Sequence, residues 1–277
     1  MQAIGLLRFS YPAIGGFQVH HDTAEARMRY LYAPERMEER FRLFEAVALP
    51  SLCNQTDQDF DVIIVIGDAM PEPYLWRLQS LVAGVPQVQI QAHPPIRHRV
   101  LMKEILQKAR RNPGEPCLQF RHDDDDAVSL DFIERLRGVA VGCAALTEIY
   151  PTVAFDFSRG FLARLDASGV SAIETVRSCN VAGLAMQIAG RRQTSIMNFA
   201  HNKIPNHMPV VSIPDVPMWV RTLNTYNDSR QKPVKPIETT ALTVEEEADF
   251  QMRFGINSDL VRQAYQPHPT GRPRDRA

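Results

Sequence analysis

Four consecutive aspartates, Asp123 to Asp126, form the densest group of ionisable side chains in the sequence. They follow a short apolar run, residues 117–120, and Ser129 comes soon after them. In an extended chain Asp123 and Asp125 would point to one side, about 6–7 Å apart, while Asp124 and Asp126 would point to the other. The pattern therefore predicts paired carboxylates at the end of a strand, and Ser129 is a candidate cap for a following helix.

Carboxylates packed this closely favour a divalent cation. Two unit charges about 4 Å apart repel each other by about 4 kcal/mol at an effective dielectric constant near 20. A cation removes this repulsion, and oxygen ligands favour Mg²⁺ or Mn²⁺. The alternative interpretation is a solvated acidic loop, or a helix N-terminus where negative charge is favourable. Location at the carboxyl end of a strand, where open α/β sheets bind their ligands, favours the metal site.

The elements that would position these aspartates alternate between strand and helix patterns over the first 150 residues. Strand-like apolar runs occupy residues 3–9, 62–66, 87–92 and 117–120. Helical spacing of apolar residues marks the segments 34–49, 71–82, 100–109 and 130–146, the first of them bounded by Pro34 and Pro50. Such alternation predicts an α/β fold with a parallel sheet covered by helices.

After residue 150 the pattern changes. Residues 153–157 and 161–165 read as a β-hairpin around a turn at 158–160, so the central sheet is expected to be mixed but mainly parallel. Thr243 and Glu246 fit a capping box for a late helix. We expect one catalytic domain over residues 1–230, then a linker and C-terminal helices packed on it over residues 231–266. A disordered tail, rich in Pro and Arg, is expected over residues 267–277.

Composition excludes several classes of protein. Lys and Arg total 31 against 32 Asp and Glu, so no global field attracts a nucleic acid polymer or an anionic membrane. A hydrophobic fraction of 44% and a charged fraction of 23% exclude collagen, coiled coils and wholesale disorder. The four cysteines, Cys53, Cys117, Cys143 and Cys179, form no CxxC pair. Without a long apolar run or a signal-peptide pattern, we expect a cytoplasmic protein with at most peripheral membrane contact.

The chain resembles the bacterial rhamnosyltransferase family, whose members have the GT-A fold, a nucleotide-binding α/β sandwich. The segments that carry the resemblance are residues 5–12, 33–37, 55–60, 67–68, 121–127 and 224–229. It implies a glycosyltransferase that uses Mn²⁺ or Mg²⁺ and a nucleotide-diphospho-sugar donor. The acceptor would be a carbohydrate or a lipid-linked molecule. The sequence contains neither GxGxxG nor GxxxxGK[ST], which disfavours dinucleotide-dependent dehydrogenases and P-loop NTPases.

The resemblance also implies roles for particular residues. Asp123 and Asp125 would form the Asp-x-Asp pair, in which Asp125 ligates the metal and Asp123 contacts the ribose or a metal-bound water. Asp126 is the alternative metal ligand. The ends of the first two strands would hold the nucleoside, which implicates Arg8 with Phe9, and Asp68.

Two basic segments could balance the charge of a diphosphate leaving group. Residues 95–111 contain six Lys and Arg against one Glu, and residues 191–235 contain seven Lys and Arg against two Asp. We assign to donor binding Arg121 and, in the second segment, Arg221, Asn224, Asn227 and Ser229. Many GT-A enzymes place a metal-binding His in this region. Asn224 occupies that place here, with His201 and His207 as possible substitutes.

An inverting transferase needs a general base, and Asp156 and Asp215 are the candidates. The sequence does not distinguish an inverting from a retaining reaction. A sugar-phosphate nucleotidyltransferase, which shares the sheet and a metal, is the enzymatic alternative. A cation-binding or partner-binding module, in which the aspartates are a solvated surface, is the non-enzymatic alternative.

Overall fold

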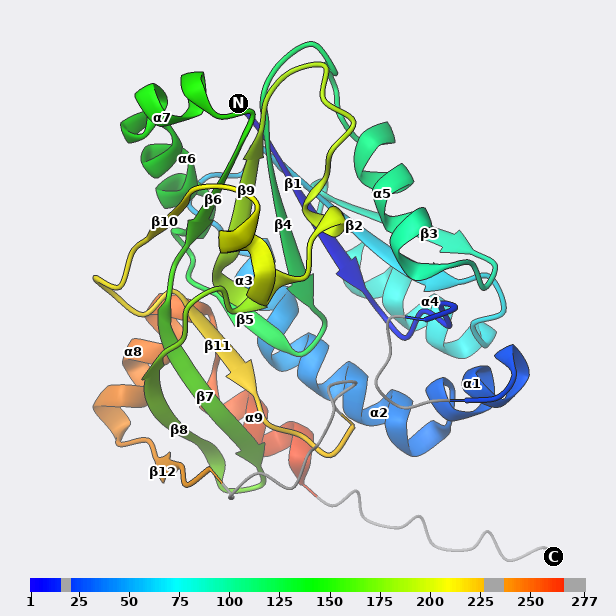
Figure 1. Ribbon diagram of the computed structural model, residues 1–277. Helices are drawn as coiled ribbons and strands as arrows, with labels where there is room; N and C mark the ends of the chain where they lie inside the picture. The colour runs from blue at the N-terminus through cyan, green and yellow to red at the C-terminus, as the bar shows by residue number, and fades with distance from the viewer. Residues whose placement is uncertain (16–20, 227–236, 267–277) are drawn as a thin grey trace, which may run out of the picture.

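Seven strands form the main sheet: β1 (Gln2–Arg8), β2 (Phe60–Gly67), β3 (Val88–His93), β4 (Cys117–Asp123), β6 (Thr152–Asp156), β9 (Leu184–Ile188) and β10 (Val210–Ser212). Their order is β10-β6-β9-β4-β1-β2-β3 in the computed structural model, which describes residues 1–15, 21–226 and 237–266 (Figure 1). Neighbouring strands pair in parallel, except that β9 runs antiparallel to β4 and β6. The predicted mixed, mainly parallel sheet is confirmed.

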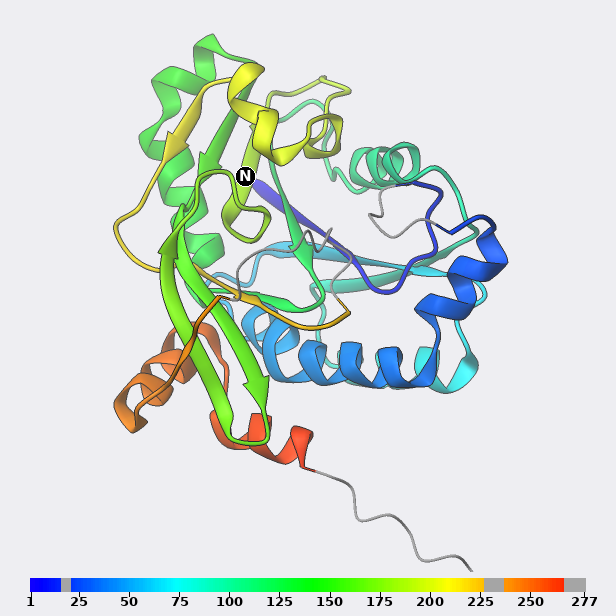
Figure 2. The same ribbon diagram turned by 60° about the horizontal axis from the view of Figure 1, so that its bottom comes forward.

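Helices cover both faces of the main sheet, and Figure 2 shows α2 and α5 on opposite sides of it. The helices are α1 (Ala24–Leu31), α2 (Pro34–Leu43), α3 (Leu49–Cys53), α4 (Glu72–Val82), α5 (His98–Lys108), α6 (Phe132–Gly142), α7 (Ala144–Ile149), α8 (Val244–Phe254) and α9 (Ser258–Tyr265), with a π-helical turn η1 (Phe44–Ala48) and 3-10 turns η2 (Val181–Gly183), η3 (Ile196–Asn198) and η4 (His201–Asn206). Residues from α2, α4 and α6 form the apolar core on one face. Residues from α5, η3 and η4 form the core on the other.

A second sheet contains the strands β5 (Asp126–Val128), β7 (Arg159–Asp166), β8 (Gly169–Val176), β11 (Trp219–Thr222) and β12 (Thr240–Ala241), in the order β12-β8-β7-β11-β5. Because β5 follows β4 almost directly, the chain passes from the main sheet to the second sheet through only Asp124 and Asp125. Helices α8 and α9 contribute Phe250, Phe254 and Val261 to the core beside this second sheet.

The predicted hairpin between residues 153–157 and 161–165 is wrong. β6 contains residues 153–156 and β7 contains residues 161–165, but the two strands belong to different sheets, and β7 instead forms its hairpin with β8. Gly160, read as a turn residue, lies within β7, where a Cβ atom would come within 2.5 Å of the Trp219 carbonyl oxygen. The glycine therefore allows β11 to approach β7 closely, and it does not form a turn.

Two predicted helix boundaries also differ from the structure. The helix expected to end before Pro50 continues through this residue. The π-helical turn η1 precedes α3, and Pro50 lies in the first turn of α3, where the missing N–H of a proline costs little. Ser129 does not cap α6. Asp131 occupies the N-cap position, without a capping hydrogen bond, and the Ser129 hydroxyl lies 3.3 Å from the sulfur of Met218.

The last helix, α9, is attached to the helix α2 by its C-terminal end. The predicted capping box of Thr243 and Glu246 is confirmed at the start of α8. At the end of α9, the Tyr265 hydroxyl donates a 2.8 Å hydrogen bond to Glu39, and the Arg42 guanidinium lies 5.6 Å from the Tyr265 ring. Residues 231–236 of the expected linker and the expected tail lie outside the described residues, and the division at residue 230 stays a prediction.

Substitution of Tyr265 by phenylalanine is expected to lower the free energy of unfolding by about 1–3 kcal/mol, because the hydroxyl bonds a carboxylate in a partly buried position. Urea denaturation measures this loss. Tyr150→Phe is the control, since Tyr150 is 45% exposed and its substitution should change stability very little. Equal stabilities of the two variants would contradict a role for Tyr265 in attaching α9 to α2.

Candidate active site

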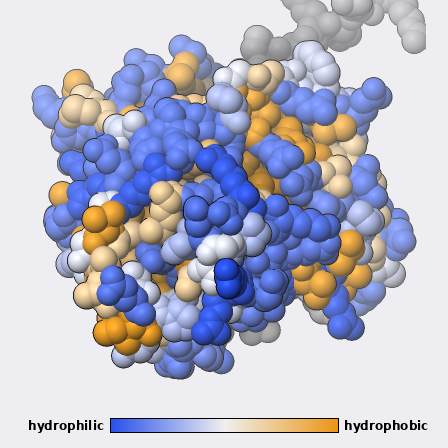
Figure 3. Space-filling model, turned by 90° about the horizontal axis from the view of Figure 1, so that it is seen from above, coloured by the Kyte–Doolittle hydropathy of each residue, from blue (hydrophilic) through white to orange (hydrophobic). Residues whose placement is uncertain are grey.

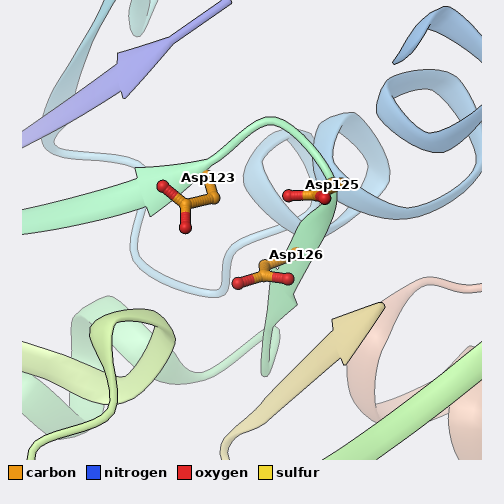
Figure 4. Close-up of side chains that lie close together, drawn as sticks. All are labelled: Asp123, Asp125 and Asp126. Atoms are coloured by element: carbon orange, nitrogen blue, oxygen red, sulfur yellow. The ribbon is translucent and has the colours of Figure 1, made fainter. Parts of the chain in front are cut away.

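The turn between β4 and β5 carries the four aspartates and joins the two sheets. Asp123 ends β4, and Asp126 begins β5 (Figure 4). Because the chain turns at Asp124 and Asp125, the extended geometry expected from the sequence does not hold. One carboxylate oxygen from each of Asp123, Asp125 and Asp126 lies within 4.8 Å of the other two. Asp126 thus joins the Asp-x-Asp pair, and Asp124 is the residue that faces elsewhere.

Arg40 of α2 binds the two aspartates at the turn. Its Nε atom donates to Asp124 at 3.1 Å, its Nη2 atom pairs with the other Asp124 oxygen, and its Nη1 atom donates to Asp125 Oδ2 at 2.9 Å. The Arg40 and Asp124 side chains are each only 5% exposed. A bidentate ion pair of this kind fixes the orientation of both planar groups. Arg40 therefore holds the turn against α2.

β11 and the residues after it support the turn from the other side. The Thr222 hydroxyl donates to the Asp125 carbonyl at 2.8 Å, and the Thr222 amide donates to Asp126 Oδ1 at 3.2 Å. The Asn224 amide donates to Asp125 Oδ2 at 2.8 Å. Arg221, opposite Asp126 in the strand register, has its pKa raised, chiefly by the charge of Asp126. Of the predicted donor-binding residues, Arg221 and Asn224 therefore lie at the acidic turn.

The environments of the neighbouring carboxylates separate their pKa values. Burial and the charges of Asp125 and Asp123 raise the pKa of Asp126 well above its ordinary value, although Arg221 opposes them. Burial also acts to raise the pKa of Asp125, but Arg40 and Asn224 outweigh it and hold that pKa below its ordinary value. The carboxylates of Asp123, Asp125 and Asp126 are hard oxygen ligands, which fits a site for Mg²⁺ or Mn²⁺.

Positive side chains gather next to Asp123, at the carboxyl ends of β1 and β4. Arg8 is the strand neighbour of Asp123, and Arg121 lies two residues before it on the same strand. Burial lowers the pKa of Arg121; Asp123 opposes this effect, whereas Arg8 and Arg99 add to it. Burial and these same three arginines lower the pKa of His98 to about 3. The structure thus brings the predicted residues Arg8, Arg121 and Asp123 together.

Asp156, a candidate general base, is fully buried at the end of β6. Its Oδ2 atom accepts a 3.3 Å hydrogen bond from Ser212, and its Oδ1 atom has no partner among the described residues. Burial raises its pKa, although the Cys179 backbone and Ser212 oppose this shift. It does not belong to the group formed by Asp123, Asp125 and Asp126.

The buried Asp156 is expected to make stability depend on pH. The pKa of Asp156 is raised in the folded state. At pH values between the ordinary and the raised pKa, the folded state therefore binds more protons than the unfolded chain, and the contribution of Asp156 to stability falls as pH rises through that window. Asp156→Asn keeps the acceptor for Ser212 and removes this loss. The stability of the variant relative to the wild type should therefore increase with pH in urea denaturation. A difference that is constant with pH would contradict the buried-carboxyl account.

Asp215, the other candidate base, is exposed and pairs with Arg135 of α6. The Arg135 hydrogen bond contributes to a lowered pKa of Asp215, against an opposing effect of burial. None of the contacts of Asp215 is with the acidic turn. Its role stays a prediction.

The remaining predicted residues lie in three settings. Phe9 is fully buried and packs against Phe41 and Phe44, so its side chain belongs to the core. Asp68 is exposed just after β2, close enough to raise the pKa of Tyr32, for which burial is the larger cause. Asn227 and Ser229 lie outside the described residues.

The two histidines proposed as substitute ligands lie outside the carboxylate cluster. The His201 Nδ1 atom lies 2.8 Å from the Cys179 carbonyl, and His207 packs against Phe199. Asn224, in the place of the family's histidine, donates its amide to Asp125 and accepts from the Tyr226 amide with its oxygen. In this arrangement Asn224 orients a carboxylate through a hydrogen bond.

Sequence reasoning missed Arg40 and Thr222. The signal for Arg40 was its position on the helical face that also carries Met37, Phe41 and Phe44. A charge on an apolar face must be paired when it is buried, and the densest acidic segment was the obvious source of a partner. Thr222 had no comparable signal, since its contacts arise from the pairing of β11 with β5.

The surface of the protein carries apolar side chains on several elements. Trp76 on α4, Val141 on α6 and Met252 on α8 are each about 70% exposed, at 69%, 73% and 72%. The face in Figure 3 is largely hydrophilic, with hydrophobic residues in separate patches. Within the described part of the chain, none of the helices has both the length and the apolar character required to cross a membrane.

Comparison with known proteins gives the family of the chain. The crystal structures of S. aureus TarS 1-349, alone and in complex with UDP-GlcNAc, are each 9% identical to the chain with a TM-score of 0.44. The alignments cover 80% and 82% of this chain, which spans 60% of the length of TarS 1-349. No curated protein is significantly similar in sequence. A family model described as "Putative rhamnosyl transferase" matches residues 2–236, and the chain therefore belongs to this family of glycosyltransferases.

Proposed function

We propose that the protein transfers a sugar from a nucleotide-diphosphate donor to a hydroxyl acceptor with the help of Mn²⁺ or Mg²⁺. The observation that carries this proposal is the group of carboxylate oxygens from Asp123, Asp125 and Asp126, which lie within 4.8 Å of one another at the carboxyl end of β4. Family membership supports the transferase activity. Nucleoside-diphosphate-activated rhamnose, suggested by the family's name, is the first donor to test, and the acceptor would be a carbohydrate or a lipid-linked molecule.

Asp123, Asp125 and Asp126 would hold the metal. When bound, a divalent cation stabilises the negative charge that develops on the departing diphosphate. The protein's own contribution begins with Asp125, which Arg40 and Asn224 hold in one orientation through hydrogen bonds of 2.9 and 2.8 Å. Fixing a ligand in advance removes the cost of ordering it during the reaction.

Donor binding would use the groups around the acidic turn. Arg8 and Arg121 lie beside Asp123, and Arg221 lies beside Asp126. Guanidinium groups are therefore available on both sides of the carboxylates to bind the nucleotide-sugar. Asp68, at the end of β2, would contact the nucleoside. Asp156 and Asp215 remain the proposed bases; since Asp156 is fully buried, it could take a proton only after a local rearrangement.

A panel of nucleotide-sugars incubated with the protein and Mn²⁺ tests the proposal. A transferase releases nucleoside diphosphate from at least one donor, through transfer or slow hydrolysis, and the release stops when EDTA is added. A sugar-phosphate nucleotidyltransferase instead consumes nucleoside triphosphate and releases pyrophosphate. If neither reaction occurs and calorimetry detects no metal-dependent nucleotide binding, the aspartates belong to a binding module and the proposal is wrong.

A further inference from the structure

His201, the first residue of the 3-10 turn η4, is held in one tautomer by a backbone carbonyl group. Its Nδ1 atom lies 2.8 Å from the Cys179 carbonyl oxygen. A carbonyl oxygen can only accept a hydrogen bond, so Nδ1 carries the proton, and in a neutral imidazole the free lone pair is then on Nε2. The side chain is partly exposed, and Nε2 has no hydrogen-bond partner within residues 1–15, 21–226 and 237–266. His201 therefore presents an unused proton acceptor.

The backbone that orients His201 has an uncommon conformation. Cys179 has a φ of 55°, in the left-handed region that residues with a Cβ atom rarely adopt. Such conformations persist only where the surrounding structure holds them, and they are frequent at active sites. Burial raises the pKa of Asp156 and the Cys179 backbone opposes this effect, so the buried carboxylate lies against the same backbone. Asp156 therefore contacts the turn that orients His201.

The turn at Cys179 lies beside the acidic turn. The next residue, Asn180, accepts a 3.4 Å hydrogen bond from Arg221 with its Oδ1 atom, and Arg221 is opposite Asp126 in the pairing of β11 with β5. The 3-10 turn η2, which follows Asn180 directly, contacts β4, β5 and β11. His201 thus adjoins the proposed metal centre from the side of η2, although it is not one of the clustered ligands.

The surroundings of His201 favour its neutral form. Burial is the largest cause of the lowered pKa of His201, and the charges of Arg121 on β4 and Arg221 on β11 add to it. The hydrogen bond to Cys179 and the charge of Asp123 oppose these effects without reversing the shift. Nε2 is therefore unprotonated at neutral pH. The influence of these charges also places His201 near the carboxyl ends of β4 and β11.

Asn180 provides a second unused polar group beside His201. Its side chain is 6% exposed, and its Nδ2 atom is buried without a hydrogen-bond partner among the described residues. A buried N–H group without an acceptor is costly unless a ligand supplies one. A hydroxyl group both accepts and donates a hydrogen bond. The amide of Asn180 and the Nε2 atom of His201 together complement the oxygen and the proton of such a group.

We propose that His201 is the general base that takes the proton of the attacking hydroxyl, which Asn180 binds. The inference rests on the proposed function for the reaction, and it gives His201 the role otherwise proposed for Asp156 and Asp215. The hydroxyl oxygen forms a bond to the anomeric carbon of the donor sugar while the bond from that carbon to the diphosphate oxygen breaks. The diphosphate leaves with the electron pair of the broken bond, Nε2 takes the proton, and the imidazolium then releases it to solvent. This single displacement inverts the anomeric carbon.

Hydrolysis of the donor that the nucleotide-sugar panel identifies tests this role, with water as the attacking hydroxyl. His201→Gln keeps an N–H donor for the Cys179 carbonyl but has no basic nitrogen. It should lower kcat for the release of nucleoside diphosphate by about a hundredfold or more, and leave the KM of the donor and the Mn²⁺-dependent affinity for nucleoside diphosphate unchanged. Imidazole added to His201→Ala should restore part of the lost rate. His93→Gln, at a partly exposed histidine that ends β3, is the matched control and should keep the wild-type kcat.

The outcomes separate this inference from the proposed function. If the wild type hydrolyses a donor and His201→Gln keeps its kcat, or if imidazole restores nothing to His201→Ala, His201 is not the base although the transferase assignment stands. A loss of nucleoside diphosphate affinity in His201→Gln as large as its loss of kcat would show a binding role and overturn the inference. Full activity of His201→Gln with loss in Asp156→Asn or Asp215→Asn would return the role to that carboxylate. If the wild type turns over no donor, the transferase assignment fails and the base role fails with it.

Discussion

Asp125→Asn is expected to lower the rate of sugar transfer by about three orders of magnitude, because loss of a metal ligand removes several kcal/mol of transition-state stabilisation and about 1.4 kcal/mol corresponds to a factor of ten. The substitution keeps the size of the side chain and an acceptor oxygen for Arg40 and Asn224, both of which donate to Asp125 Oδ2. The fold should therefore survive. The measurement is the turnover of the donor that the panel identifies, at saturating Mn²⁺.

The control for Asp125→Asn is Asp249→Asn, which removes one negative charge from an exposed position on α8. This variant should keep wild-type activity, and both variants should have native far-UV circular dichroism. If Asp125→Asn retains full activity with a native spectrum, the assignment of Asp125 to the metal site is wrong. A loss of activity in both variants would show that the effect is not specific to the acidic turn.

Arg40→Met is expected to lower the free energy of unfolding by about 3–5 kcal/mol, since removing one partner of a buried ion pair leaves a buried charge without compensation. Asp124 would lose both of its bonds to Arg40, and Asp125 would lose one. Urea denaturation at neutral pH measures the effect. The double variant Arg40→Met with Asp124→Asn should recover part of the loss, because the carboxylate that remained unpaired is removed as well.

Arg42→Met is the matched control for Arg40. Arg42 lies two residues further along α2, is 33% exposed and pairs with Glu39 of the same helix. Exposed pairs of this kind contribute about 1 kcal/mol or less, and the contact of Arg42 with the Tyr265 ring adds about 0.5–1 kcal/mol, so the control should still lose much less stability than Arg40→Met. Similar losses in the two variants would contradict the view that Arg40 holds the acidic turn. If the changes in the free energy of unfolding caused by Arg40→Met and by Asp124→Asn simply add in the double variant, direct coupling between Arg40 and Asp124 is contradicted.

Much of the main sheet could be predicted from local patterns. The β-branched run 62–66 lies within β2 because a strand buried on both faces must be apolar throughout. The capping box at Thr243 was equally local. The position of the four aspartates at the end of a strand followed from the apolar run before them, and β4 does end at Asp123.

Features that depend on contacts distant in sequence could not be predicted in this way. Alternating residues in β6 and β7 indicated two strands, but alternation does not show that the strands belong to different sheets. β5 has only three residues, too few for a pattern, and its pairing with β11 makes Asp126 a neighbour of Arg221. The turn at Asp124 and Asp125 follows from this crossing between sheets, and it selects which three aspartates converge.

The binding of Mn²⁺ to the three aspartates tests the account most directly, and electron paramagnetic resonance measures it in solution. In the presence of a nucleoside diphosphate, the wild type should bind one Mn²⁺ ion per chain. Asp123→Asn combined with Asp126→Asn should abolish this binding, because both substitutions remove ligands from the group whose oxygens lie within 4.8 Å of one another. Binding of Mn²⁺ by this double variant with unchanged affinity, or no binding by the wild type, would contradict the assignment of the acidic turn as the metal centre.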